Sequence, residues 1–331
     1  MTERLLRSGL IALVLTLGAT PGLAQGAGQT DAAAGYPRQT IKIVVGVSRD
    51  GTNDLIARLM AQKLGERLAK VVVVENMPGK GGFVAADYVA RAAPDGYTIL
   101  TAPAGLMSVS PAVYRKLPYD ALASFELIAN VATYPFLLSV SADHPAKTVT
   151  GLVAWAKAHP RSASYASASA IFQLTAELFM ARTGTRFKPI SFNSGDEMVT
   201  ALLTRNVTLA FADPGPVMPQ IEARRLRPLA TTGTRRMYAF PNVPTLVEAG
   251  ISDLVVEGYT GLVLPKGTPV AIVKKLEAEV IELVRHADVH DRLTQFGVIP
   301  SGETGAEFTA RIAGEIKHWT TVAKVANIKL D

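Results

Sequence analysis

Residues 41–64 read IKIVVGVSRDGTNDLIARLMAQKL, and this stretch decides how the first part of the chain folds. The apolar run Ile41–Val45 is rich in β-branched residues and predicts a β-strand. Asp54 then opens a predicted helix, because apolar residues from Leu55 to Leu64 recur at the spacing of one helical face. The polar loop between the two elements completes a strand–loop–helix unit.

The same alternation of strand and helix continues along the chain. Further strands are predicted at residues 71–74, 97–100, 125–131, 136–140, 164–166, 190–192, 207–211 and 229–231. The four consecutive valines Val71–Val74 are typical of a buried parallel strand. Strands that alternate with helices indicate an α/β fold with mainly parallel sheets.

The length of the chain favours two domains, because 331 residues exceed the roughly 250–300 that one hydrophobic core normally serves. No Pro/Gly-rich linker lies near the middle, so we expect the chain to cross between domains within strands or short loops. The prediction is a first domain of residues 36–139 and 259–331 and a second domain of residues 140–258. A ligand cleft is expected between them, where loops leave the carboxyl ends of strands.

Pairs of residues predict where three of the later helices begin. Ser194 and Glu197 form a capping-box pattern, and so do Thr304 and Glu307. Thr268 is expected to cap another helix, with Pro269 at its first helical position.

The first 24 residues predict a cleaved secretory signal peptide. Basic residues precede the short apolar core Leu10–Leu17, and Gly22–Ala24 offers small residues for cleavage. The apolar core is roughly half of the ~20 residues that a membrane-spanning helix needs. Residues 25–35 are expected to form a disordered leader. We therefore expect a periplasmic protein.

The composition excludes several kinds of chemistry. The chain has no cysteine, which rules out disulfides, thiolate catalysis and cysteine-bound metals. The net charge of +6 comes from scattered basic residues, so a nucleic-acid partner is not expected, although a positive field would attract anionic solutes. His286 and His290 lack the HExxH pattern, and Pro78–Gly82 lacks the order of a phosphate loop. No metal, cofactor or catalytic residue is predicted.

The loop before the first helix has the features of an anion site. The first N–H groups of a helix have no partner within the helix and carry a partial positive charge, so they attract an anion. Gly51 permits close approach of the backbone, and Thr52 and Asn53 can donate further hydrogen bonds. The alternative is that Asn53 or Asp54 merely caps the helix.

Several segments together carry a resemblance to a known family. They are Gly46–Arg58, Val73–Gly82, Ala92–Thr98, Leu117–Asp120, Pro241–Thr245 and Glu248–Gly250. In this order they resemble the tripartite tricarboxylate transporter substrate-binding proteins, or Bug family, over almost the whole mature chain. The resemblance implies a two-lobed, periplasmic-binding-protein-like (type II) fold, with a ligand cleft between two doubly wound domains.

The resemblance also implies which residues face the ligand. Family members hold a carboxylate through loop backbone amides, small hydroxyl residues and trapped water. The ligand-binding residues implied here are Ser48, Arg49, Asp50, Gly51, Thr52, Asn53, Asp54, Ala104, Ser167, Ala168, Ser169, Phe192 and Asp213.

Some positions depart from the family pattern. Arg49 and Asp50 replace small residues or proline; Arg49 either pairs with a second ligand carboxylate or forms with Asp50 a solvated surface pair worth at most about 1 kcal/mol. The loop from Ser167 is shorter than usual, with Gln173 near the place of a frequent histidine. Phe192 stands where tyrosine is common. Asp213 matches a frequent family aspartate, with either a binding or a structural role.

The implied function is a solute-binding protein that captures a di- or tricarboxylate, an acidic amino acid or an aromatic acid. It would deliver this ligand to the membrane permease subunits of a tripartite tricarboxylate-type transporter, and we expect it to be a monomer. Two alternatives remain open. A ligand-sensing binder for a two-component system would use the same cleft, and an exported α/β enzyme would need a positioned nucleophile or acid–base pair.

Overall fold

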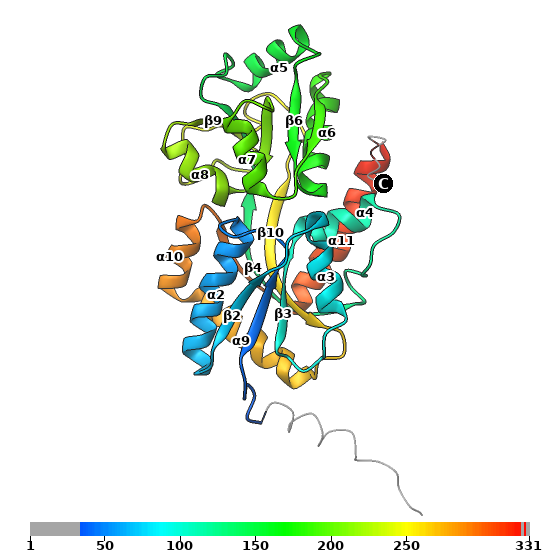
Figure 1. The fold of residues 1–331 in the computed structure, drawn as a ribbon, viewed down its shortest axis with the longest axis vertical. Helices are drawn as coiled ribbons and strands as arrows, with labels where there is room; N and C mark the ends of the chain where they lie inside the picture. The colour runs from blue at the N-terminus through cyan, green and yellow to red at the C-terminus, as the bar shows by residue number, and fades with distance from the viewer. Residues whose placement is uncertain (1–33, 326–327, 329–331) are drawn as a thin grey trace, which may run out of the picture.

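The computed structural model describes residues 34–325 and residue 328, and its strands form two separate sheets in an elongated, two-lobed molecule (Figure 1). The predicted signal peptide, residues 1–24, lies outside the described residues, as does most of the predicted leader, residues 25–35. Within the described part, no helix is long and apolar enough to cross a membrane.

The first sheet has six strands. Their order is β11 (Ile299–Thr304), β4 (Phe125–Pro135), β10 (Glu257–Pro265), β3 (Thr98–Pro103), β1 (Ile41–Val45) and β2 (Val72–Asn76). β1 pairs in parallel with β2 and β3, whereas β10 pairs antiparallel with β3 and β4, and β11 antiparallel with β4. The β1 side chains of Ile41, Ile43 and Val44 are completely buried, as the apolar run predicts.

Two groups of helices cover this sheet. One group is α2 (Thr52–Leu68), α9 (Val270–Arg285) and α10 (Ala287–Gln295); the other is α3 (Phe83–Ala90), α4 (Ser110–Val113) and α11 (Gly305–Val325). A short 3₁₀ turn, η1 (Lys80–Gly82), precedes α3, and a π-helical turn, η2 (Gly105–Val109), precedes α4. The last helix, α11, packs on β4, so the C-terminal helices return to the first lobe as expected.

The second sheet has five strands. Their order is β7 (Lys188–Ser191), β6 (Ser164–Ser167), β8 (Leu209–Ala212), β5 (Leu137–Ser141) and β9 (Leu226–Thr231). The helices of this lobe are α5 (Val149–Ala158), α6 (Ala170–Thr183), α7 (Gly195–Leu203) and α8 (Pro214–Glu222). β6 pairs in parallel with β7 and β8, and β5 pairs antiparallel with β8 and β9.

The chain crosses between the lobes twice. On the way out, β4 ends at Pro135 and β5 begins at Leu137, so Phe136 alone separates the two sheets. On the way back, residues 232–256 lead from β9 to β10, and β10 pairs with β4 along the middle of the molecule. The predicted limits of the domains, 36–139 with 259–331 and 140–258, stay a prediction.

The expectation of mainly parallel sheets is wrong, because both sheets are mixed. The chain leaves the first lobe through β4 and returns through β10, so these two neighbours run in opposite directions. The strand predicted at Val71–Val74 is parallel to β1 but is not buried. It forms the edge of the sheet as β2, with Val71 63% and Val73 39% exposed.

Two of the three predicted helix caps are present in the structure, and the third is not. Ser194 caps α7 by accepting from the Glu197 amide at 3.2 Å, as predicted. Thr304 and Glu307 form the predicted capping box before α11. The predicted Thr268 cap is wrong: its hydroxyl donates to the Pro265 carbonyl, and α9 begins at residue 270, after Pro269.

The first helix also starts earlier than predicted. α2 begins at Thr52 rather than at Asp54, and Gly51 is its N-cap residue. No side chain caps this helix, so the alternative in which Asn53 or Asp54 is a simple cap is wrong. The uncapped N-terminus leaves its first amide groups without partners from the cap.

Candidate functional site

A cavity of about 70 Å³ lies between the lobes, beside the strands that join them. Loops after β1 and β3 line it from the first lobe, and loops after β6, β7 and β8 line it from the second. Tyr134, Phe136 and Gly258 of the crossing segments close one wall. The cleft therefore lies where loops leave the carboxyl ends of strands, as predicted.

The N-termini of four helices meet at this cavity. The N-cap residues Gly51 of α2, Ser169 of α6, Ser194 of α7 and Asp213 of α8 all line it. Neither Gly51 nor Ser169 makes a side-chain cap hydrogen bond, so the first amides of α2 and α6 remain available. Helix N-termini carry a partial positive charge, and the cavity is therefore suited to an anion.

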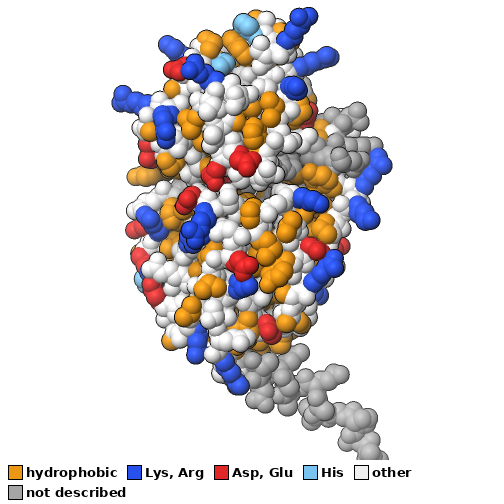
Figure 2. Space-filling model, in the orientation of Figure 1, with side chains coloured by type: hydrophobic (Ala, Val, Ile, Leu, Met, Phe, Trp, Pro, Cys, Tyr) orange, Lys and Arg blue, Asp and Glu red, His pale blue; other side chains and the backbone are white. Residues whose placement is uncertain are grey.

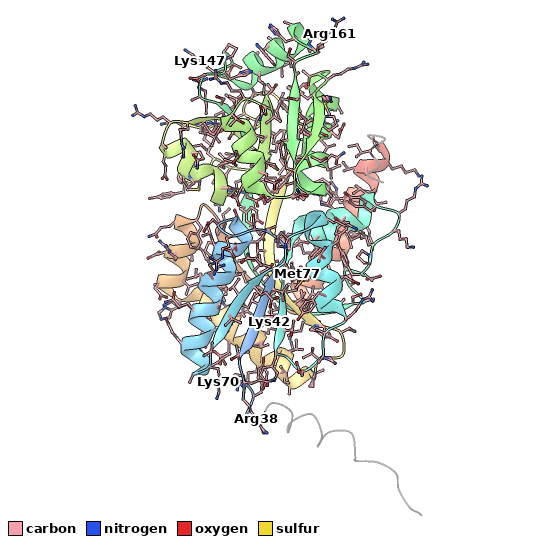
Figure 3. All side chains as sticks on the ribbon, in the orientation of Figure 1. Arg38, Lys42, Lys70, Met77, Lys147 and Arg161 are labelled. Carbon is pink, nitrogen blue, oxygen red and sulfur yellow. The ribbon has the colours of Figure 1, made fainter. Side chains whose placement is uncertain are left out.

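This positive character comes without basic side chains. Among the described residues, those that line the cavity include no Lys, Arg or His. Figure 2 shows Lys and Arg spread over both lobes rather than gathered in one patch on the visible face. In Figure 3, Lys147 and Arg161 lie at the far end of the second lobe, and Arg38 and Lys70 at the opposite end of the first.

The predicted residues of the first loop have different surroundings. Ser48, Gly51 and Asn53 line the cavity. Arg49 and Asp50 are exposed and lie outside its lining. Asp50 has a left-handed backbone, with φ of 66°, and its amide donates to Asp54. These two positions therefore shape the turn into α2 without facing this cavity.

Asp54 braces the first loop. Its carboxylate is completely buried and accepts hydrogen bonds from Arg58 Nε at 2.7 Å and Asn76 Nδ2 at 2.7 Å, besides the Asp50 amide at 3.1 Å. Asn76 Nδ2 also donates to the Val47 carbonyl at 3.1 Å. Both oxygens of Asp54 are thus engaged within the protein, which holds the loop and the start of α2 in place.

Direct hydrogen bonds join the two lobes across the cleft. Ser48 Oγ donates to Asp196 Oδ2 at 2.9 Å. The Gly215 amide of α8 donates to Thr52 Oγ1 at 2.9 Å. Thr52 is completely buried and is not among the lining residues. The lobes are therefore in contact, and Thr52 contributes to that contact rather than to the cavity wall.

Asn53 is oriented by a short chain of polar groups. Its Oδ1 accepts a hydrogen bond from Thr260 Oγ1 at 2.5 Å, and that hydroxyl lies 3.2 Å from the Tyr134 hydroxyl. The Asn53 side chain also interacts with the Tyr134 hydroxyl, so it is held from two sides where it lines the cavity.

The second lobe supplies an apolar wall beside polar backbone. Ala168 and Ser169 line the cavity, together with Ile171 and Phe172. Phe172 packs edge to face on Phe136, with ring centroids 5.3 Å apart. Ala104 and Leu106 of the first lobe extend the apolar surface.

Two other predicted residues of this lobe face a neighbouring space. Ser167 and Phe192 line a cavity of about 190 Å³ that also touches Lys80 and Gln173. Ser167 Oγ donates to the Ser169 carbonyl at 3.1 Å, and its own carbonyl accepts from the Phe192 amide at 2.8 Å. Ser167 and Phe192 therefore support the loop after β6 from behind.

Asp213 lies at the start of α8 and lines the central cavity. Its side chain makes no cap hydrogen bond. The residue is partly buried, and loss of solvation raises the pKa of this carboxyl to about 7. Perturbed groups of this kind concentrate at functional sites.

Several lining residues were missed in the sequence. Asn193–Asp196 follow β7 at its carboxyl end, and that position was a usable signal. Tyr134, Phe136 and Gly258 lie within the crossing segments, where periodicity marks only a buried strand. Their place at the cavity depends on the exchange of strands between lobes, which no local pattern encodes.

A larger hollow of about 450 Å³ lies beside the return crossing and is lined by residues 235–239 and 297–300, among others. It contains none of the four N-cap residues. Among the described residues no cluster of three potential metal ligands occurs. His286 and His290 are exposed, and His286 contacts Asp288 at 2.6 Å.

Comparison with known proteins decides the family. The model of the tripartite tricarboxylate transporter family receptor, TctC, matches residues 56–328. The chain belongs to this family. A UPF0065 protein encoded in the gbd 5′ region of Cupriavidus necator is 34% identical to this TctC receptor over 316 residues, 92% of each chain.

Solved structures of similar proteins agree with this assignment. Rpa4515 of R. palustris, determined with adipate, superimposes on the TctC receptor with a TM-score of 0.86, at 30% identity over 89% of this chain and 99% of its own. MatC from Rhodopseudomonas palustris, with bound malate, gives a TM-score of 0.82 at 27% identity, over 87% and 99% of the two chains. The predicted two-lobed α/β fold is confirmed.

Proposed function

We propose that this TctC receptor captures a small carboxylate between its two lobes. The observation that carries the proposal is the meeting of helix N-termini at a cavity without basic side chains. Backbone amides and helix dipoles stabilise an anion there by roughly 0.3–1 kcal/mol per helix, and by up to ~2 kcal/mol where the geometry is partly buried. The polar side chain of Asn53 lines the same cavity.

The rest of the cavity favours an organic anion over an inorganic one. The cavity is also lined by the apolar side chains of Ile171, Phe172, Phe136 and Leu106. An apolar wall with a few placed polar groups is typical of sites for small organic molecules. Adipate and malate, which the two similar proteins bind, are small organic anions of this kind. We extend the proposed ligand class to di- and tricarboxylates, acidic amino acids and aromatic acids.

We further propose that the protein works in the periplasm. Export would use the signal peptide of residues 1–24, and the loaded receptor would deliver its ligand to the permease subunits of a tripartite tricarboxylate-type transporter. We propose that it binds as a monomer, with domains at 36–139 with 259–331 and at 140–258. It would need no cofactor and carry out no catalysis.

The test is a binding screen on exported protein that has been denatured and refolded to remove any ligand carried through purification. The panel holds dicarboxylates, citrate, acidic amino acids, nicotinate and aromatic acids. A ligand that binds only the folded state raises the melting temperature in proportion to RT ln(1 + [L]/Kd). A shift with one carboxylate class supports the proposal, and no shift with any of them contradicts it.

A matched pair of variants tests the place of binding. Asn53→Asp keeps the acceptor that Thr260 uses but brings a negative charge to the cavity, so it should lower affinity at least about tenfold. Asn242→Asp makes the same change at an exposed position outside the cavity and should bind normally. Equal affinity of the two variants would place the ligand elsewhere.

A further inference from the structure

The cavity between the lobes carries acidic side chains and no basic ones. Asp196 and Asp213 line it, and Tyr134 is the remaining titratable residue of the lining. Two carboxylates beside a bound carboxylate would repel it, since like charges at this range disfavour one another. At least one of these groups must therefore lose its charge or gain a donor when a carboxylate binds.

The two aspartates differ in their hydrogen bonds. Asp196 Oδ2 accepts a hydrogen bond from Ser48 Oγ at 2.9 Å and lies in the first turn of α7, where a helix stabilises negative charge. Asp213 occupies the N-cap position of α8, yet its side chain accepts no cap hydrogen bond. Asp196 is thus compensated and Asp213 is not.

The sequence after Asp213 explains why this aspartate has no donor. A capping aspartate normally accepts from the amide of the second or third helical residue. Here the first and third residues are Pro214 and Pro216, which have no amide hydrogen. The amide of the second residue, Gly215, donates to Thr52 Oγ1 across the cleft. None of the first three residues of α8 therefore has an amide hydrogen left to donate to Asp213.

The described elements around α8 do not supply a cation either, since Arg58 of the neighbouring helix α2 is paired with Asp54. From β4, Tyr134 interacts electrostatically with Asp213, but its hydroxyl lies 3.2 Å from Thr260 Oγ1. From α7 comes the second acid, Asp196. On β9, Arg227 donates to the carbonyls of residues 142–146. Burial without compensation raises the pKa of the Asp213 carboxyl to about 7.

We propose that Asp213 is a specificity-determining residue that holds a proton in the occupied cleft and donates it in a hydrogen bond to a carboxylate oxygen of the ligand. The inference rests on the proposed carboxylate function. A neutral carboxyl is a donor, whereas a carboxylate only accepts, so protonation turns a repulsive contact into an attractive one. Capture of the ligand then takes up one proton from solvent.

The sign of the pH effect follows from this exchange. The ligand's negative charge favours the protonated form of Asp213, so binding raises the pKa of its carboxyl further. The affinity for the ligand is highest, and independent of pH, at pH values below the pKa of Asp213 in the free protein. It falls by up to tenfold for each pH unit above that pKa, until the pKa of the complex is reached.

The experiment measures the affinity for adipate and malate by calorimetry from pH 6 to pH 9. The second carboxyl of such a dicarboxylic acid titrates at about pH 5, above the first, so both probes are mostly dianions at pH 6 and keep a constant charge from about pH 7 upward, where the expected loss of affinity begins. Wild-type affinity should fall by up to tenfold per unit above about pH 7. Asp213→Asn, which donates without titrating, should bind at pH 9 more tightly than wild type and show a flat profile. Asp196→Asn should keep the wild-type slope.

A second measurement does not depend on the folding of a variant. Calorimetry of the wild-type protein at pH 8 in buffers of different ionisation enthalpy should detect uptake of about one proton per ligand. Binding without proton uptake overturns the inference but leaves the carboxylate function intact. Affinity that rises with pH, and is lost in Asp213→Asn, also overturns it, because Asp213 would then accept a hydrogen bond from the ligand. Absence of binding to every acid of the panel at every pH contradicts the proposed function itself.

Discussion

Replacement of Gly215 by alanine should weaken ligand binding by preventing the lobes from closing. Gly215 is the second residue of α8, and its amide donates to Thr52 Oγ1 at the start of α2. A Cβ atom at this position would lie 2.8 Å from Thr52 N, 2.9 Å from Oγ1 and 3.1 Å from Cα. Two of these atoms belong to backbone at a helix start, which cannot rotate out of the way.

The magnitude follows from where the overlap occurs. Thr52 and Gly215 belong to different lobes, so the added methyl group is strained only while the lobes touch. Overfilling a packed site costs about 1–3 kcal/mol. A penalty confined to the closed state weakens binding by the corresponding factor of about 5–150. Alanine also gains up to about 1 kcal/mol of helix propensity over glycine, but open and closed states share that gain and it cancels in binding.

The assay compares ligand affinity by calorimetry in wild type, Gly215→Ala and Gly314→Ala. Gly314 lies in the helix α11, and a Cβ atom there would meet nothing within 4 Å. It therefore shares the propensity gain without the overlap, and its affinity should equal that of wild type. If Gly215→Ala folds and binds as tightly as Gly314→Ala, the contact between Thr52 and Gly215 is not part of the liganded state.

Three further predictions concern stability. Asp213→Asn should gain stability relative to wild type as pH rises from about 4 to about 7, by up to about 1.4 kcal/mol per pH unit, because folded Asp213 keeps a proton that the unfolded chain releases. Urea unfolding at several pH values measures this difference, and a difference that stays constant with pH contradicts the prediction. Asn76→Ala removes a donor from buried Asp54 and should cost about 1.5–3 kcal/mol in the same assay, whereas a loss below about 0.5 kcal/mol would show that Asn76 does not brace the loop. Ser194→Ala should cost about 1 kcal/mol through loss of the α7 cap, and an unchanged melting temperature would argue against that cap.

Local features of the fold could be predicted because they depend on neighbours in the sequence. The strand Ile41–Val45, the following helix and the Thr304 capping box each follow from residues within a few positions of one another. The exposure of Val71 could not be predicted in this way. Four consecutive valines predict a β-strand but not its position in the sheet. The strand lies at the edge, with β1 as its one neighbour in the sheet, and this position leaves it partly exposed to solvent.

For the candidate site, too, the features that depend on sequence neighbours could be predicted and those that depend on distant elements could not. The loops after strands were found because their position is local, and Ser48, Gly51, Asn53, Ala168 and Ser169 do line the cavity. The meaning of a loop residue depends on what the other lobe brings to it. The sequence predicts Thr52 as a hydrogen-bond donor to the ligand, but it does not show that the hydroxyl oxygen also accepts from Gly215 of the other lobe.

The division of the helix N-termini between the lobes would couple binding of the proposed ligand to contact between the lobes. α2 approaches the cavity from the first lobe, and α6 and α7 approach it from the second. An arginine on one lobe would hold an anion whether or not the lobes met. Helix N-termini act only over about one turn, so the full set of amides surrounds the anion only when the lobes are in contact. A carboxylate bound there would therefore favour the state in which the lobes are in contact, and only such a difference in affinity allows a ligand to shift an equilibrium between states.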